Sequence, residues 1–282
     1  MNNVFKWLKL KKGDITDAEK LLRENENNYV SACSRYLTRE TEKDPVWILK
    51  SKTNGLEALL INSKSILMPV FPGCKEIPPP DFLNGFLRIN NIHSIQGLTE
   101  EVKLLEEALS KKGMKARDII DYDLMSFEIP SMLNTKKNYP EKLELCVPLL
   151  SDAEALAPLQ AGYEKEEVIP KGSIYNPLSS RLNIIKIIKN AKILAARLDG
   201  RFVGKININA VSFSRYQIGG VYVCPDFRGR GIAGKMTQEF IKSLLDQGRG
   251  ITLFVKKINI AALKLYKSLG FVVHNDYRIT YY

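Results

Sequence analysis

The feature that most constrains the fold of this 282-residue chain is an internal repeat. The stretch WLKLKKGDITDAEKLLREN near the start and LELCVPLLSDAEALAPLQAG near the middle each read as a short strand, a turn and a helix. Asp17-Ala18-Glu19 in the first matches Asp152-Ala153-Glu154 in the second. A match of this kind suggests that one α/β unit occurs twice.

Two later pairs of signals follow in the same order. Asn54-Gly55 and Asp199-Gly200 stand between apolar runs and predict tight hairpins, because both turn positions need a positive φ. Helices predicted over 99–112 and 258–269 are followed by Gly113 and Gly270, which can form left-handed caps. Duplication is favoured over two unrelated α/β domains, and we place the boundary at Pro140, giving domains 1–140 and 141–282.

Charge differs between the two halves. The chain carries a net charge of +11, of which +2 belongs to residues 1–140 and +9 to residues 141–282. A basic half suggests an anionic partner, such as a phosphate-bearing cofactor, nucleic acid or a membrane surface. On charge alone, however, a lysine-rich but otherwise ordinary surface is the preferred interpretation.

The composition and the spacing of key residues argue against several classes of protein. No apolar run approaches the roughly 20 residues that cross a bilayer, and the N-terminus lacks a secretory apolar core. The four cysteines are far apart and the two histidines have no ligand spacing, so neither a metal site nor a disulfide scaffold is expected. We therefore expect a cytoplasmic protein with no metal and no membrane contact.

The most informative segment is QIGGVYVCPDFRGRGIA, residues 217–233. Val221, Tyr222 and Val223 alternate as in a strand, and a helix with apolar spacings of three and four residues begins near Ile232. Gly219-Gly220 is unusual within a strand, and we interpret it as a place where a ligand approaches the backbone.

The loop between that strand and that helix predicts phosphate binding. A helix start presents free N–H groups and the positive end of the helix dipole, while glycines leave the backbone open to a phosphate. Gly229 and Gly231 supply the glycines, and Arg228 and Arg230 add cationic donors. The spacing is not that of a P-loop, and the acidic residue expected after a dinucleotide-binding loop is missing.

A second motif follows one strand later. Residues 259–271 read NIAALKLYKSLGF, in which Asn259, Ala262, Leu265, Tyr266 and Gly270-Phe271 fit the pattern N-x-x-A-x-x-L-Y-x-x-x-G-F. Together with Arg228, Gly231 and Ala233, which fit Q/R-x-x-G-x-G/A, this motif resembles the GNAT superfamily of acetyl-CoA-dependent N-acetyltransferases.

The resemblance covers residues 141–282, and the layout is similar to tandem-GNAT proteins. It implies an α/β fold of two GNAT-like domains, each a twisted, mostly antiparallel sheet flanked by helices, with a degenerate first copy.

The resemblance also implies a set of roles around acetyl-CoA as cosubstrate. The backbone of Val221, Tyr222 and Val223 would pair with the pantetheine arm, and Asn259 would touch that arm. Tyr266 would act as general acid for the departing thiolate, with an N–H near Val221 holding the oxyanion. The N–H groups of the loop would hold the pyrophosphate, through Arg228, Gly229, Arg230, Gly231, Ile232 and Ala233.

The general base is not identified by the sequence. Many GNAT enzymes carry a glutamate on the strand before the phosphate loop, yet the strand 214–223 contains no acid, and Gln217 cannot act as a base. The first half lacks both motifs, because residues 72–80 read PGCKEIPPP and Leu109 stands where Tyr266 would. We predict that residues 1–140 do not bind coenzyme A.

The function predicted from the sequence is acetyl transfer from acetyl-CoA to a primary amine by direct attack on the thioester. The acceptor, a small molecule or a peptide amine, and the length of the acyl chain stay open, as does assembly into a homodimer. The alternative is an acetyl-CoA-binding sensor or scaffold without catalysis, encouraged by the missing acid. A nucleic-acid partner is not expected, because no recognition helix or aromatic RNA-binding motif is present.

Overall fold

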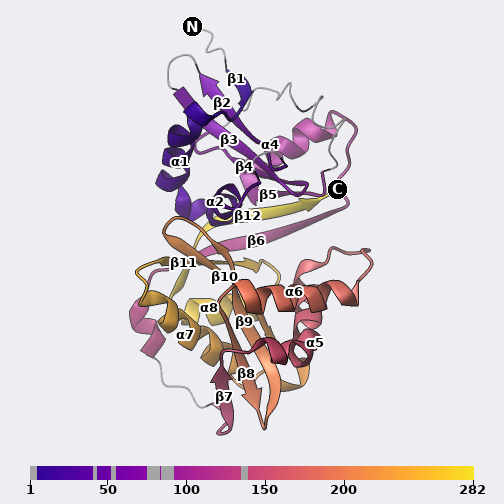
Figure 1. The fold of residues 1–282 in the computed structure, drawn as a ribbon, viewed down its shortest axis with the longest axis vertical. Helices are drawn as coiled ribbons and strands as arrows, with labels where there is room; N and C mark the ends of the chain where they lie inside the picture. The colour runs from indigo at the N-terminus through magenta and orange to yellow at the C-terminus, as the bar shows by residue number, and fades with distance from the viewer. Residues whose placement is uncertain (1–4, 41–42, 52–54, 75–82, 84–91, 135–138) are drawn as a thin grey trace. The chain divides into compact units, whose positions relative to one another are not determined.

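A computed structural model describes residues 5–40, 43–51, 55–74, 83, 92–134 and 139–282. It divides into two compact units (Figure 1), the first formed by Met1–Leu124 with His274–Tyr282 and the second by Met125–Val273. The boundary placed at residue 140 from the sequence thus falls inside the second unit, and the C-terminal residues belong to the first.

The strands and helices of the first unit follow the order that the sequence predicts. Its elements are β1 (Lys6–Lys9), α1 (Ile15–Glu24), α2 (Val30–Leu37), β2 (Val46–Ser51), β3 (Gly55–Ser63), β4 (Ile66–Val70), β5 (Ser94–Leu98) and α4 (Thr99–Ser110). Most of the chain between β4 and β5, including the predicted proline-rich segment 78–80, lies outside the described residues.

The second unit has the same order with one more described helix. Its elements are β7 (Leu143–Cys146), α5 (Ala153–Tyr163), the π-helical turn η5 (Glu164–Val168), α6 (Pro177–Asn190), β8 (Ile193–Leu198), β9 (Arg201–Val211), β10 (Arg215–Val223), the short turn η6 (Pro225–Phe227), α7 (Ile232–Leu245), β11 (Gly250–Lys256) and α8 (Ile260–Ser268). Two further strands, β6 (Asp118–Phe127) and β12 (Phe271–Tyr281), belong partly to each unit.

The predicted turn chemistry is confirmed where it is described. Asp199 and Gly200 have φ values of 49° and 78° and join β8 to β9 in a tight antiparallel hairpin. Gly113 and Gly270 have φ values of 81° and 99° close to the ends of α4 and α8. Asn54 lies outside the described residues, while its neighbour Gly55 has a φ of 81°.

Each unit has a mostly antiparallel sheet with one parallel pair. The strand order is β1-β2-β3-β4-β5 in the first unit and β7-β8-β9-β10-β11 in the second. The parallel pairs are β4 with β5 and β10 with β11. The predicted mixed α/β fold, mostly antiparallel in both units, is confirmed.

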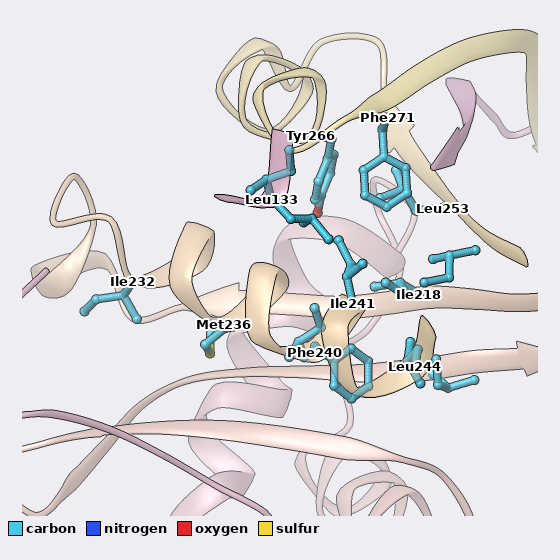
Figure 2. Packing of buried hydrophobic residues seen from close by; sticks show 14 of the residues in the cluster. Leu133, Ile218, Ile232, Met236, Phe240, Ile241, Leu244, Leu253, Tyr266 and Phe271 are labelled. Atoms are coloured by element: carbon cyan, nitrogen blue, oxygen red, sulfur yellow. The ribbon is translucent and has the colours of Figure 1, made fainter. Parts of the chain in front are cut away.

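Helices cover both faces of the sheet in the second unit. Successive residues of a strand point to opposite faces, so Ala195 packs in a cluster with α5 and α6, and Ala196 packs in the main core with α7. That core contains Met236, Phe240 and Tyr266, all less than one-tenth exposed (Figure 2). Helix α7 therefore packs against one face of the sheet, next to β10, the strand that precedes it.

Candidate functional site

Strands β10 and β11 separate halfway along their length. Their parallel register runs from Arg215↔Gly250 to Ile218↔Leu253, and no later pair occurs, although β10 continues to Val223 and β11 to Lys256. The backbone of β10 beyond Ile218 thus borders a gap on the side of β11. The predicted residues Val221, Tyr222 and Val223 all lie on this stretch.

The loop after β10 holds its backbone in a conformation that suits an anion. Gly229 and Gly231 have φ values of 77° and 78°, in the left-handed region that glycine adopts without strain. Gly231 is the N-cap of α7, and the first N–H bonded within the helix is that of Lys235, which donates to the Gly231 carbonyl at 3.0 Å.

The helix start therefore leaves several donors open. None of the described residues accepts a backbone hydrogen bond from the N–H groups of Ile232, Ala233 or Gly234. These groups lie at the positive end of the α7 dipole, where an anion is stabilised. The arrangement has the donors and the dipole that bind a phosphate or a pyrophosphate.

The two arginines of the loop differ in their partners. Arg228 donates through Nε to the Val223 carbonyl at 2.9 Å and through Nη2 to both carboxylate oxygens of Glu166 at 2.9 Å. The Tyr222 hydroxyl donates to the same carboxylate at 3.1 Å. Arg230 instead donates to the Asp226 carbonyl at 3.1 Å, so its side chain turns back on its own loop.

Asn259 is the N-cap of α8. Its Oδ1 accepts a hydrogen bond from the Ala262 N–H at 3.1 Å, and its Nδ2 donates to Glu167 at 3.1 Å. The cap explains why an asparagine begins the second motif, because its side chain satisfies one of the free donors of the helix. Asn259 thus has a structural role as a helix cap, and its contact with the cofactor arm stays a prediction.

Tyr266 lies on α8 with only 6% of its surface exposed, and its ring centroid is 5.9 Å from that of Phe271 (Figure 2). Burial, with smaller contributions from Tyr163 and Glu167, raises the pKa of Tyr266 well above its usual value of 10. The phenol therefore keeps its proton at neutral pH and is available as a hydrogen-bond donor.

Sequence reasoning missed the acidic turn η5, which directly follows α5. Glu164 is buried and accepts hydrogen bonds from Gln160 at 2.8 Å, from Asn183 at 2.9 Å and from the Ser180 hydroxyl. Glu166 and Glu167 contact Arg228 and Asn259 as described above, and Lys256 also lies 3.5 Å from Glu167. The run of glutamates after a predicted helix was the signal that could have identified it.

A second missed group is a row of polar side chains on β9. Lys205, Asn207 and Asn209 alternate along the strand, and Asn207 donates through Nδ2 to Asn209 at 2.9 Å. A Cβ at Gly219 would lie 1.9 Å from the Asn209 side chain, and one at Gly220 the same distance from the Asn207 side chain. The predicted approach of a ligand to Gly219-Gly220 is therefore not needed to explain the glycines, since neighbouring side chains occupy that space.

The residues described contain no cluster of three or more His, Cys, Asp or Glu side chains that could hold a metal ion. Within the same residues, no helix has the length and apolarity to cross a bilayer.

The family follows from these elements together with a sequence comparison. The profile of the acetyltransferase (GNAT) family matches residues 161–271, the stretch from the end of α5 to the start of β12. This chain carries a GNAT-family domain. The match contains the η5 glutamates, the β9 polar row, the phosphate loop and α8.

Curated and solved relatives agree with this assignment. Over 63 residues the chain is 49% identical to the mycothiol acetyltransferase of Corynebacterium jeikeium, a stretch that is 21% of this chain and 18% of that protein.

The structure of a GCN5-related N-acetyltransferase from Sphaerobacter thermophilus matches with a TM-score of 0.59 and 16% identity, over 98% of this chain and 94% of the other. A tandem GNAT protein from the clavulanic acid biosynthesis pathway matches with a TM-score of 0.57 and 11% identity, over 98% of both chains. The GNAT fold therefore extends over the whole chain, including the first unit.

Proposed function

We propose that the second unit is an N-acetyltransferase that moves an acetyl group from acetyl-CoA to a primary amine. The observation that carries the proposal is a set of three features between β10 and α8: a gap beside β10, open N–H groups at the start of α7, and a protonated phenol on α8. The family assignment supports the same reaction class.

The residues fit the cosubstrate. The donors at Gly229–Ala233 suit a pyrophosphate, because they combine positive φ glycines with a helix start. The free edge of β10 suits an extended arm that pairs as a strand does, through the backbone of Val221 and Val223. Asn259 follows β11 in the chain, and its amide donates to the Glu167 carboxylate.

Acetyl-CoA supplies the acetyl group as a thioester. In the transfer a nitrogen–carbon bond forms, the carbon–sulfur bond breaks with its electron pair on sulfur, the nitrogen loses one proton and the sulfur gains one. The Val221 N–H stabilises charge on the carbonyl oxygen. Tyr266 gives the sulfur its proton as general acid, and its raised pKa keeps the phenol protonated across the neutral range before that step.

For the proton lost by the amine we propose Glu167. The strand before the loop has no acid, whereas Glu167 accepts a hydrogen bond from Asn259, the N-cap of the helix that carries Tyr266. Its carboxylate is held by Asn259 and Lys256, so it has a defined position. It replaces the strand glutamate that the family pattern leads one to expect.

The experiment is release of free thiol from acetyl-CoA with a panel of amines, run on the wild-type chain and on Tyr266→Phe. Amine-dependent release that falls in the variant supports the enzyme. Binding of acetyl-CoA with no release for any amine, and no effect of Tyr266→Phe, would instead establish the non-catalytic sensor.

For the first unit we propose a role without coenzyme A. Glu101 on α4 is 5% exposed and accepts hydrogen bonds from the Phe71 N–H at 3.2 Å and from the Tyr29 hydroxyl. Phe71 directly follows β4, the strand that corresponds to β10. The donor that an extended arm would need there is therefore already bonded to a side chain of the same unit.

A further inference from the structure

The most unusual buried group of the second unit is Lys205 on β9. It has no exposed surface, and none of the described carboxylates forms an ion pair with it. Its Nζ donates to the Gly220 carbonyl at 3.0 Å and to the Asn207 Oδ1 at 3.1 Å, and it lies 4.7 Å from the centre of the Tyr163 ring. Burying a lysine amine with no ion-paired carboxylate costs free energy, so its presence calls for a physical reason.

The carbonyl that Lys205 contacts belongs to an irregular part of β10. The register between β9 and β10 shifts between Gly219 and Tyr222, and Gly220 has a φ of 60°. A Cβ at either position would have to displace a neighbouring side chain, because Asn209 and Asn207 occupy the space. The glycine pair, the bulge and the polar row on β9 thus form one arrangement that brings Nζ to the Gly220 carbonyl.

The geometry of a peptide bond shows what this contact does. In a trans peptide the carbonyl oxygen and the N–H of the next residue point in opposite directions, and the described chain has no cis bonds. Since the Gly220 oxygen points to Lys205 on β9, the Val221 N–H points away from β9. The side of β10 away from β9 is the side of β11, where the gap lies.

We propose that Lys205 is a positioning residue for acetyl transfer: it holds and polarises the Gly220–Val221 peptide so that the Val221 N–H faces the gap between β10 and β11. Hydrogen bonding to the carbonyl withdraws electron density from the amide and strengthens its N–H as a donor. This inference rests on the proposed function, in which that N–H stabilises the charge on the thioester oxygen.

The surroundings of Lys205 fit such a role. Burial lowers its pKa to about 7 from an ordinary value of 10.5, while Glu164 on η5 opposes that shift. The hydroxyl of Tyr163 on α5 is hydrogen-bonded to the Gly220 backbone and to the Asn209 side chain. The Gly220 backbone is thus held by two side chains from different elements, which restrains the orientation of the next N–H.

The kinetic test compares Lys205→Met with Lys192→Met. Lys192 is exposed just before β8, and its Nζ lies 5.7 Å from the centre of the Tyr216 ring near the start of β10, so the control removes one lysine of the same unit without touching the Gly220–Val221 peptide. We expect Lys205→Met to lower kcat about tenfold, less than the loss of an oxyanion donor outright, with the Kd for acetyl-CoA within twofold of wild type. A kcat within twofold of wild type, or a Kd weakened in parallel with kcat, would overturn the proposal.

The second readout needs neither activity nor a bound cosubstrate. We expect the ¹⁵N chemical shift of the Val221 amide to differ from the wild-type value in Lys205→Met and to equal it in Lys192→Met. In the wild-type chain, a scalar coupling across the hydrogen bond from Lys205 ¹⁵Nζ to the Gly220 ¹³C′ is expected. Its absence would overturn the proposal even if Lys205→Met failed to fold.

The role of Lys205 and the proposed acetyltransferase function can be refuted separately. If the wild-type chain transfers acetyl groups but Lys205→Met is as fast, only the role of Lys205 is wrong. If the wild-type chain binds acetyl-CoA and transfers to no amine, the proposed function is wrong, whatever the amide shift shows.

Discussion

The two parallel strand pairs of the molecule begin alike and end differently. In the first unit β4 and β5 pair at Ile66↔Ser94 and Leu67↔Ile95 and then separate, although β4 continues to Val70. In the second unit β10 and β11 separate after Ile218↔Leu253. The same fold thus opens its sheet at the corresponding place in both copies.

What occupies each opening is the instructive difference. Beyond β4 the first backbone donor, at Phe71, is bonded to the buried carboxyl of Glu101, which also binds Tyr29. Beyond β10 the chain instead enters a glycine loop whose donors at Ile232 and Ala233 have no described partner. We infer that a copy of this fold can lose its cofactor by supplying its own acceptor for the strand, without losing the sheet.

The largest effect is expected from Tyr266→Phe, which removes the proposed donor from the active copy. We expect kcat to fall by about a hundredfold or more, in the range of a general acid, with the KM for acetyl-CoA little changed. Steady-state kinetics on the best amine measures both constants. The matched control is Tyr216→Phe, whose hydroxyl on β10 bonds Gln247 at 2.6 Å in the same core; a comparable loss in that control would remove the assignment.

In the first unit, we expect the substitution Glu101→Gln to change the pH dependence of stability. Burial raises the pKa of Glu101 to about 8 from 4.5, so the folded unit keeps a proton that the unfolded chain releases. Stability of this unit therefore falls as pH rises from about 4.5 to 8, by on the order of 3 kcal/mol. An uncharged glutamine should abolish that fall.

Tryptophan fluorescence reports this unit alone, because the only two tryptophans of the chain are Trp7 and Trp47. Denaturation is followed at pH 5 and pH 8 in wild type, Glu101→Gln and Glu100→Gln, the last an exposed acid of the same helix. A wild-type unit that is equally stable at both pH values would contradict the burial of an uncompensated carboxyl.

Gly231→Val tests the phosphate loop of the second unit, and a matched glycine variant in the first unit serves as its control. A β-branched residue is strained at a φ of 78°, by about 1–2 kcal/mol, so the affinity for acetyl-CoA should fall about fivefold to thirtyfold. The control is Gly113→Val, at a φ of 81° after α4 in the first unit, which carries similar strain. Calorimetry on both variants decides, and an equal loss of affinity in the two would show that the effect is general instability.

The smallest effect is expected from Glu166→Gln. The ion pair between Glu166 and Arg228 is about half exposed, so it contributes up to about 1 kcal/mol. Releasing the guanidinium for a phosphate should improve the Kd for acetyl-CoA by about twofold to fivefold. Glu154→Gln, which breaks the exposed pair with Arg181, should leave the Kd unchanged; weaker binding in Glu166→Gln would mean that the pair shapes the site instead of competing for it.

Local sequence signals located the elements and the family well. The glycine loop before Ile232, the Asp199-Gly200 turn and the asparagine that begins α8 each have a conformational or capping requirement that can be read residue by residue. Lys205 and Glu101 could not be identified in this way. Their roles depend on burial and on partners far along the chain, such as Gly220 and Phe71, and no local pattern records those contacts.

The same limit applies to Gly219-Gly220. A glycine pair in a strand indicates that something lies close to the backbone, but not what it is. The structure places the Asn207 and Asn209 side chains there. The charge difference of +9 against +2 between residues 141–282 and 1–140 favours an anionic partner for the second half, but it names no residue.

The central claim is that only one of two similar folds binds the cofactor, and a calorimetric titration of acetyl-CoA into the full chain tests it most directly. The account predicts a single class of sites with one molecule bound per chain. Two molecules bound per chain would contradict it, because Glu101 and Phe71 would then have to release each other to admit a second.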